Sequence, residues 1–327
     1  MRSISQLAAV ASIALVFALP AAAQDWPARP VTMVVPFAAG GPADTVGRIL
    51  SPGLSEIVGQ QVVVENVGGS GGMTGTARVA KAPPDGYQLV LGNLGTHAAN
   101  QTFYKNPLYN AATDFTPVML IAQTPLVLLA RKHLPADDLP QFIAYSKANQ
   151  GSMQYGSGGV GSASHLGCAL LNATIGIKVT HVPYRGAAPA MQDLIAGRID
   201  YQCPDSPIAI PQIESGTIKA IAVLTRDRSP SLPAQATAHE QGLADFDASN
   251  WFALFFPKGT PAAIVQKMHA AVVATIENAV VRSRMQEIGA DLMPPARRSP
   301  DYLQTFVETE IAKWAGPIKA SGAAIEN

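Results

Sequence analysis

The sequence is poor in charge, in aromatic residues and in cysteine. Of its 327 residues, 14% are charged, 6% are aromatic and only two are cysteine. Lysine plus arginine and aspartate plus glutamate number 23 each, so the formal net charge is +0. A nucleic-acid-binding protein needs a basic face, which this balance disfavours. The six histidines are scattered without metal-ligand spacing, so we expect no metal site.

The one long apolar run lies at the N-terminus. Residues 1–23 combine Arg2, an apolar stretch over 7–19 and the small residues Ala21, Ala22 and Ala23. This pattern is typical of a secretory signal peptide cleaved near Ala23. The alternative is a membrane anchor, for which the run is short. No cysteine lies near residue 23, which disfavours a lipoprotein, and we expect an exported mature protein.

Export bears on the two cysteines, Cys168 and Cys203. Disulfides persist outside the cytosol, so we predict that these two residues pair. Two buried free thiols remain the alternative, because pairing does not follow from sequence alone.

Predicted strands and helices alternate along the chain. Apolar runs bounded by turn residues predict strands, and apolar residues at helical spacing predict helices. Strands are expected at 31–35, 61–65, 87–92, 118–122, 126–130, 153–155, 179–183, 199–203, 219–224 and 251–255. Helices are expected after Pro42 with a kink or break near Ser51, and at 139–149, 162–172, 189–196, 207–214 and 262–288, with a last helix from Pro300. Such alternation is typical of parallel sheets with helices on both faces.

Two crossings divide the chain into two domains. The apolar runs around Thr124 and Pro125 indicate the first crossing, and the second is placed after Thr225. We therefore expect residues 24–123 plus 226–327 to form domain I and residues 124–225 to form domain II. In parallel sheets, ligands bind at the carboxyl ends of strands. The glycine-rich loops follow strands, so they are expected to face one another across a cleft.

The stretch over residues 31–48 is the strongest binding candidate. A buried strand, the glycines Gly40 and Gly41 and a helix beginning near Pro42 leave backbone N–H groups unpaired at a helix N-terminus. The helix dipole is positive there, which favours a carboxylate or phosphate. We expect a second glycine loop near residue 160 to close over the same anion.

Several motifs together resemble one family. These are VPFAAGG over 35–41 with Asp44, PDGY over 84–87, GTH over 95–97, GGVG over 158–161 with His165, HVPYRG over 181–186, and DL over 193–194 with AG over 196–197 and Asp200. They are similar to the Bug family, the periplasmic receptors of tripartite tricarboxylate transporters. The resemblance implies a type II periplasmic-binding-protein (Venus-flytrap) fold, with two doubly wound α/β domains joined by two crossover strands. It also implies a periplasmic location, a small carboxylate ligand and inner-membrane permease subunits as partners.

The resemblance also implies the binding residues. Backbone N–H groups and hydroxyls of the loops over 37–44 and 158–165 hold one carboxylate, and other loops contact the rest of the ligand. Many members have proline where this chain has Ala38, so Ala38 is expected to offer one more donor. The full expected set is Phe37, Ala38, Ala39, Gly40, Gly41, Asp44, Gly95, Thr96, Gly158, Gly161, Ser162, Ser164, His165, Tyr184, Arg185 and Asp205.

Several of these residues also have structural interpretations. Asp44 is expected to cap its helix or orient the loop, and contact with a ligand amine is the weaker option. Ser162 and Thr96 cap helices, bind ligand or both. His165 acts as a neutral donor or a packing residue. Arg185 either meets a second carboxylate, which favours a dicarboxylate, or pairs with Asp205. Phe37 and Tyr184 sandwich a flat, aromatic ligand or pack in the core.

Three other functions compete with this interpretation. Residues 156–161 fit G-x-G-x-x-G, but an exported protein meets no dinucleotide pool. Residues 68–72 fit G-x-S-x-G, and a hydrolase would then use Ser70, Asp205 and His239. The third alternative is a receptor that docks on a signalling protein instead of a permease. We expect a monomeric binding protein with no cofactor and no catalytic residue.

Overall fold

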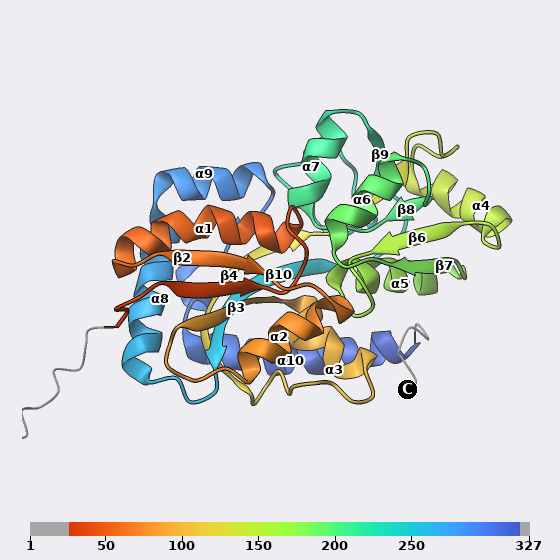
Figure 1. Ribbon diagram of the computed structural model, residues 1–327. Helices are drawn as coiled ribbons and strands as arrows, with labels where there is room; N and C mark the ends of the chain where they lie inside the picture. Colours follow the sequence, from red (N-terminus) through yellow and green to blue (C-terminus); the bar gives the residue numbers. More distant parts are fainter. Residues whose placement is uncertain (1–25, 321–327) are drawn as a thin grey trace, which may run out of the picture.

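The computed structural model describes residues 26–320, which fold into two lobes (Figure 1). The predicted signal peptide lies outside the described residues. No helix among the described residues has the length and apolar character to cross a membrane, and no group of histidine, cysteine, aspartate or glutamate within 26–320 is arranged to hold a metal ion.

The first lobe is built on a six-stranded sheet in the order β11-β4-β10-β3-β1-β2. Its strands are β1 (Val31–Val35), β2 (Val62–Asn66), β3 (Gln88–Asn93), β4 (Phe115–Pro125), β10 (Ser249–Pro257) and β11 (Asp291–Leu292). Successive residues of β1 alternate between the two faces, so Met33 and Val34 enter two separate apolar cores.

Helices cover both faces of this sheet (Figure 1). One face packs against α1 (Pro42–Val58), α8 (Ala262–Glu277) and α9 (Ala279–Glu287). The other packs against α2 (Met73–Ala80), α3 (Asn100–Phe103) and α10 (Pro300–Ala320). Short turns η1 (Ser70–Gly72), η2 (Gly95–Ala99) and η3 (Pro295–Arg297) complete the lobe.

The second lobe has a five-stranded sheet in the order β7-β6-β8-β5-β9. Its strands are β5 (Val127–Arg131), β6 (Gln154–Ser157), β7 (Thr180–Pro183), β8 (Tyr201–Gln202) and β9 (Ile218–Val223). Helices α4 (Leu139–Asn149) and α5 (Ala163–Ile175) pack on one face, and α6 (Ala187–Ile195) and α7 (Ser206–Glu214) pack on the other. Two doubly wound α/β lobes are therefore present, as expected.

Both sheets are mixed, so the expectation of parallel sheets throughout is wrong. Strands β1, β2 and β3 pair in parallel, but β10 runs antiparallel to both β3 and β4. In the second lobe, β5 runs antiparallel to β8 and β9. The antiparallel strands β4, β5 and β10 are those that lead into or out of a crossing, since a strand that changes lobes enters the next sheet without a βαβ connection.

The two crossings lie side by side. Strand β4 continues into β5 through Leu126, whose N–H donates to the Ala248 carbonyl at 3.3 Å. Ala238, Phe246 and Ala248 belong to the second lobe's core, although they follow the boundary expected after Thr225. We therefore propose that the second crossing lies at residues 248–249, and that residues 226–248 belong to domain II.

Two helix predictions are also corrected. The helix expected over 262–288 is two helices, because the Asn278 backbone is extended (φ −61°, ψ 129°) and its side chain accepts from Val280 N–H and caps α9. No break occurs at Pro52, which lies inside a continuous α1. The fully buried Leu50 and Leu54 hold α1 against the sheet, and this packing outweighs the roughly 3 kcal/mol cost of an internal proline.

Candidate functional site

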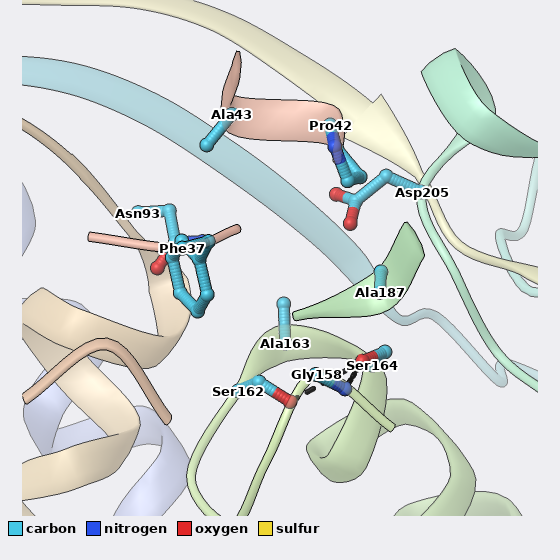
Figure 2. Close-up of a pocket in the computed structure, with 10 residues that line it drawn as sticks. All are labelled: Phe37, Pro42, Ala43, Asn93, Gly158, Ser162, Ala163, Ser164, Ala187 and Asp205. Carbon is cyan, nitrogen blue, oxygen red and sulfur yellow. Dashed lines mark hydrogen bonds between the residues drawn. The ribbon is translucent and has the colours of Figure 1, made fainter. Parts of the chain in front are cut away.

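Four helix N-termini meet at a cavity between the lobes (Figure 2). The first lobe supplies the start of α1, and the second supplies the starts of α5, α6 and α7. The space around the lining atoms, which includes space open to solvent, is about 310 Å³. The lining residues are Phe37, Pro42, Ala43, Asn93, Gly158, Ser162, Ala163, Ser164, Ala187 and Asp205.

The convergence of helix starts favours an anion in this cavity. The first N–H groups of a helix have no partner within the helix, and the dipole makes that end positive. No lysine, arginine or histidine is among the cavity-lining residues that the structure describes. The attraction for an anion therefore comes from backbone dipoles and hydroxyl groups rather than from cationic side chains.

The start of α5 is organised by two serines, Ser162 and Ser164. Ser162 is the N-cap, and its Oγ accepts from His165 N–H at 3.3 Å. Ser164 Oγ accepts from Gly158 N–H at 2.9 Å, and the two serine oxygens are 3.2 Å apart. Ser164 therefore fixes the glycine turn through its oxygen, while its own hydrogen remains available to Ser162 or to a bound solute.

Asp44 holds the glycine loop over residues 37–41, which was expected to bind the anion. Asp44 accepts from Gly40 N–H at 2.8 Å, from Arg48 Nε at 2.9 Å and from Asn66 Nδ2 at 3.0 Å. Burial acts to raise the pKa of Asp44, but these hydrogen bonds outweigh it and lower the pKa below its ordinary value. Asp44 is thus an ionised residue that orients the loop, which is one of the structural roles expected for it.

The loop itself contributes less to the cavity than expected. Of residues 37–41, only Phe37 lines it, while Ala39 and Gly40 are exposed. Ala38 was expected to donate to ligand, but its N–H donates to the Arg185 carbonyl of the other lobe at 3.2 Å. Buried Gly41 does not line the cavity either. The next residues, Pro42 and Ala43, do line it, although neither belongs to the expected binding set.

Asn93, the last residue of β3, lines the cavity and was not predicted. Thr96 is fully buried and does not cap a helix, since its Oγ1 accepts from Asn93 N–H at 2.9 Å. Neither Thr96 nor Gly95 lines the cavity, whereas Asn93 does. Asn93 Oδ1 accepts from Thr96 N–H at 3.0 Å. This bond fixes the orientation of the Asn93 amide, so its N–H groups point away from Thr96 and are available to a solute.

His165 is a neutral packing residue. Its ring stacks on His181 with centroids 4.2 Å apart, and its Nδ1 accepts from Gly161 N–H at 3.2 Å. Burial, with a smaller contribution from His181, lowers the pKa of His165 to about 3. Neither His165 nor Gly161 lines the cavity.

Tyr184 and Arg185 do not reach the cavity. Tyr184 Oη donates to Asp193 Oδ2 at 2.7 Å, so it does not sandwich a ligand against Phe37. Arg185 is exposed, and its side chain forms no ion pair with any described residue. The alternative in which Arg185 pairs with Asp205 is therefore absent from the closed arrangement of the lobes.

Asp205 is the one ionisable residue of the cavity lining. It is 4% exposed, and its Oδ1 accepts from Thr124 Oγ1 at 2.9 Å and from Asn250 Nδ2 at 2.6 Å. Burial raises the pKa of Asp205 to about 6. Thr124 lies at the end of β4 and Asn250 near the start of β10, so both crossings hold this side chain.

The predicted disulfide is present in the second lobe. Cys168 of α5 and Cys203 form a bond with a Cα–Cα distance of 5.5 Å. Cys203 lies two residues before Asp205, and Cys168 lies one helical turn after Ser164. The bond therefore fixes the start of α5 relative to the segment that carries Asp205.

The lobes are closed on one another. Tyr104 Oη donates to the Val160 carbonyl at 2.9 Å, and Ser206 Oγ donates to the Gly289 carbonyl at 2.9 Å. With the bond from Ala38 to Arg185, these contacts join the lobes on several sides of the cavity.

The residues of the alternative hydrolase are not assembled. Asp205 is bound to Thr124 and Asn250, and His239 Nδ1 accepts from Asp245 N–H at 3.1 Å. Ser70 lies in the first lobe and His239 in the segment that packs with the second.

A closed two-lobed α/β protein with an anion-binding cavity between its lobes belongs to the class of solute-binding proteins. Residues 46–323 match the family described as tripartite tricarboxylate transporter family receptor (TctC), and the chain belongs to this family. This is a family of periplasmic solute-binding receptors and not of enzymes, so the hydrolase alternative is wrong.

Individual relatives agree with this assignment. The chain is 39% identical over 319 residues to the UPF0065 protein in the TAR-I ttuE-ttuC' intergenic region of Agrobacterium vitis, covering 97% of this chain and 92% of that protein. It is 34% identical to protein BugT of Bordetella pertussis over 310 residues, covering 94% of each.

Solved structures are equally close. The periplasmic binding protein BugD has a TM-score of 0.89 at 37% identity, with 91% of this chain and 99% of BugD covered. MatC from Rhodopseudomonas palustris with bound malate has a TM-score of 0.87 at 39% identity, covering 89% and 99%. R. palustris Rpa4515 with adipate has a TM-score of 0.87 at 37% identity, covering 91% and 99%. The Bug-type receptor fold is thereby confirmed.

Proposed function

We propose that this protein captures a small carboxylate in the periplasm and delivers it to a tripartite tricarboxylate transporter permease in the inner membrane. The observation that carries the proposal is the meeting of four helix N-termini from both lobes at one cavity. A carboxylate there interacts with α1 of the first lobe and α5 of the second only when the lobes are closed. The solute therefore stabilises the closed form by its differential affinity.

The class of carboxylate is part of the proposal. Similar receptors are described with malate and with adipate, which are both dicarboxylates. However, Arg185, on which the expectation of a dicarboxylate partly rested, is exposed and away from the cavity. An aromatic solute loses support as well, because Tyr184 is bonded to Asp193. We therefore propose a small aliphatic carboxylate.

The proposal also covers the processing of the chain, its oligomeric state and the form that the permease recognises. We propose that the signal peptide is cleaved near Ala23 and that the mature protein is a monomer. The closed pair of lobes is the form that the permease recognises, as expected for a receptor of this family.

A thermal-shift panel tests the binding function. Aliphatic mono-, di- and tricarboxylates, with aromatic acids beside them, are added to the mature protein at increasing concentration. A solute at one hundred times its Kd stabilises the folded state by about 2.7 kcal/mol, which raises the unfolding midpoint measurably. We expect at least one small aliphatic carboxylate to do this, with matching heat of binding in calorimetry.

Two serine variants locate the binding site. Ser164→Ala removes the hydroxyl that lines the cavity, and Ser152→Ala removes an exposed hydroxyl whose Oγ donates to the Asn149 carbonyl. Affinity should fall about tenfold or more in Ser164→Ala and stay unchanged in Ser152→Ala. The proposal is wrong if no carboxylate shifts the midpoint, or if both variants bind like the wild type.

A further inference from the structure

A carboxylate side chain lies inside a cavity that otherwise attracts anions. Asp205 is buried, and its carboxylate points into the cavity that the four helix starts surround (Figure 2). It is the N-cap of α7, yet its side chain makes no capping hydrogen bond to that helix. The side chain is therefore not used to begin α7 and is held for another purpose.

The side chains of other residues donate to only one oxygen of the Asp205 carboxylate, and the backbone N–H of Asp205 itself also interacts with the carboxylate. Thr124 Oγ1 and Asn250 Nδ2 both donate to Oδ1. No other residue among 26–320 donates a hydrogen bond to Oδ2. A carboxylate oxygen that lines the cavity is open to a donor group on the solute, and a hydrogen bond from such a donor would stabilise the complex.

The rest of the described cavity lining supplies no cation to pair with this carboxylate. Its other lining residues are uncharged, and none of the described lining side chains is a cation. A fully ionised dicarboxylate that directed its second carboxylate at Asp205 would place two negative charges together without a compensating cation. Like charges in a dry site disfavour binding strongly.

We propose that Asp205 determines specificity by accepting a hydrogen bond from the solute, so that the receptor selects small carboxylates bearing a hydroxyl or ammonium group. The inference rests on the proposed function, since the solute's carboxylate occupies the helix starts. Its donor group meets Oδ2 of Asp205. An acid of the same skeleton without the donor leaves Oδ2 unpaired and is rejected, because a site built around a polar contact discriminates against the analogue that lacks it.

The opposing arrangement is a protonated Asp205 that donates to a second carboxylate. Burial raises the pKa of Asp205 to about 6, so the ionised form still predominates at neutral pH. The two arrangements differ in the direction of the hydrogen bond at Oδ2, and one substitution separates them.

Asp205→Asn reverses the cavity-facing group. Thr124 and Asn250 both donate, so they hold the amide oxygen of the new side chain in the position of Oδ1. The amide NH₂ then takes the position of Oδ2 and changes an acceptor into a donor. Asp205→Ala removes both groups, and Asp137→Asn, an exposed aspartate of the same lobe, is the matched control.

The experiment is calorimetry at pH 7.5 with three acid skeletons. Each skeleton is supplied unsubstituted, with a hydroxyl and with an ammonium: propionate, lactate and alanine; succinate, malate and aspartate; glutarate, 2-hydroxyglutarate and glutamate. Both stereoisomers of each substituted acid are used. For the skeleton that binds best, we expect the wild type and Asp137→Asn to bind a substituted acid at least tenfold more tightly than the unsubstituted one. Comparison of hydroxyl with ammonium identifies which donor is preferred.

The variants decide the outcome. In Asp205→Asn the preference should fall below threefold or reverse in favour of the unsubstituted dicarboxylate, and in Asp205→Ala it should disappear. The inference is overturned if the wild type binds the unsubstituted acid equally well, or if Asp205→Asn keeps the wild-type preference. If none of these acids binds but another carboxylate of the thermal-shift panel does, this inference fails and the proposed function stands, whereas both fail if no carboxylate of the panel binds. Circular dichroism of each variant verifies folding.

Discussion

Closure of the lobes should be abolished by one methyl group at Gly71. This residue lies in η1 of the first lobe, and a Cβ built on it would be 1.9 Å from the Val160 carbonyl oxygen of the second lobe. Real Cβ contacts essentially never fall below 3.0 Å, so the lobes must separate locally by at least 1.1 Å. The neighbouring atoms are backbone atoms, which do not move aside as a flexible side chain does.

The separation removes first-lobe donors from the solute. The start of α1 and the Asn93 amide are the groups that the first lobe brings to the cavity. Hydrogen bonds to a charged group contribute about 1.5–3 kcal/mol each. Loss of two such bonds costs about 3–6 kcal/mol, so Gly71→Ala should weaken binding by a factor of about 10²–10⁴.

Gly59→Ala is the matched control. Gly59 also belongs to the first lobe and has a positive φ of 81°, compared with 59° at Gly71, but nothing lies within 4 Å of its Cβ position. Both variants therefore carry a left-handed strain of about 1–2 kcal/mol, and only one blocks closure.

Two measurements check this prediction. Calorimetry with the best-binding carboxylate gives the affinity, and small-angle X-ray scattering gives the compaction on binding. Gly71→Ala should lose both, while its unfolding free energy without solute should resemble that of Gly59→Ala. Equal affinities in the two variants, or normal compaction in Gly71→Ala, would refute the reasoning.

Three further predictions follow from buried groups. Replacing both cysteines of the Cys168–Cys203 disulfide, which are 35 residues apart, should lower the unfolding free energy by about 3–4 kcal/mol in urea titration; an unchanged value would contradict this. Burial lowers the pKa of His97 and His165 to about 3 and of His181 to about 4, so the unfolded state binds more protons below pH 6.5. The free energy of unfolding should therefore fall by about 1 kcal/mol per histidine as pH falls from 6.5 to 5.5. Asp205 has a raised pKa, so it opposes this loss and adds somewhat less than about 1 kcal/mol to the free energy of unfolding over the same range. A flat urea midpoint over that range would count against neutral buried histidines. Finally, Ser162→Ala removes the cap of α5 and should cost about 1 kcal/mol of stability in the absence of solute, whereas Ser162→Asp should restore that stability but weaken carboxylate binding; unchanged stability in Ser162→Ala would argue against the cap.

Much of the fold was accessible from local sequence patterns. The first strand was predicted at residues 31–35 and is found at Val31–Val35, because an apolar run ends there in a glycine turn. The helix starts at Pro42 and Leu139 were also predicted correctly, since turn and capping chemistry involves neighbouring residues, whereas the helix expected from residue 189 begins at Ala187. The antiparallel pairing of β10 with β3 was missed because it joins residues about 160 positions apart, such as Phe252 and Asn93.

The cavity was predicted in part. Phe37, Gly158, Ser162, Ser164 and Asp205 were expected and do line it. Small residues were missed, because Ala43, Ala163 and Ala187 contribute backbone at helix starts and their side chains carry no chemical signal. Asn93 was accessible in principle, since it is a polar residue at the carboxyl end of a predicted strand.

The position of Asp205 relates solute recognition to the movement of the lobes. Asn250 Oδ1 accepts from Leu94 N–H at 3.1 Å in the first lobe, while its Nδ2 donates to Asp205 of the second. Thr124, on the other crossing, donates to the same Asp205 oxygen. Because Thr124 and Asn250 belong to the first lobe and Asp205 to the second, we expect rotation about the crossings to change the geometry of these bonds and the orientation of Asp205. A solute that bonds to Oδ2 therefore has a different affinity for the two forms, and such a difference is the only means by which a ligand shifts a conformational equilibrium.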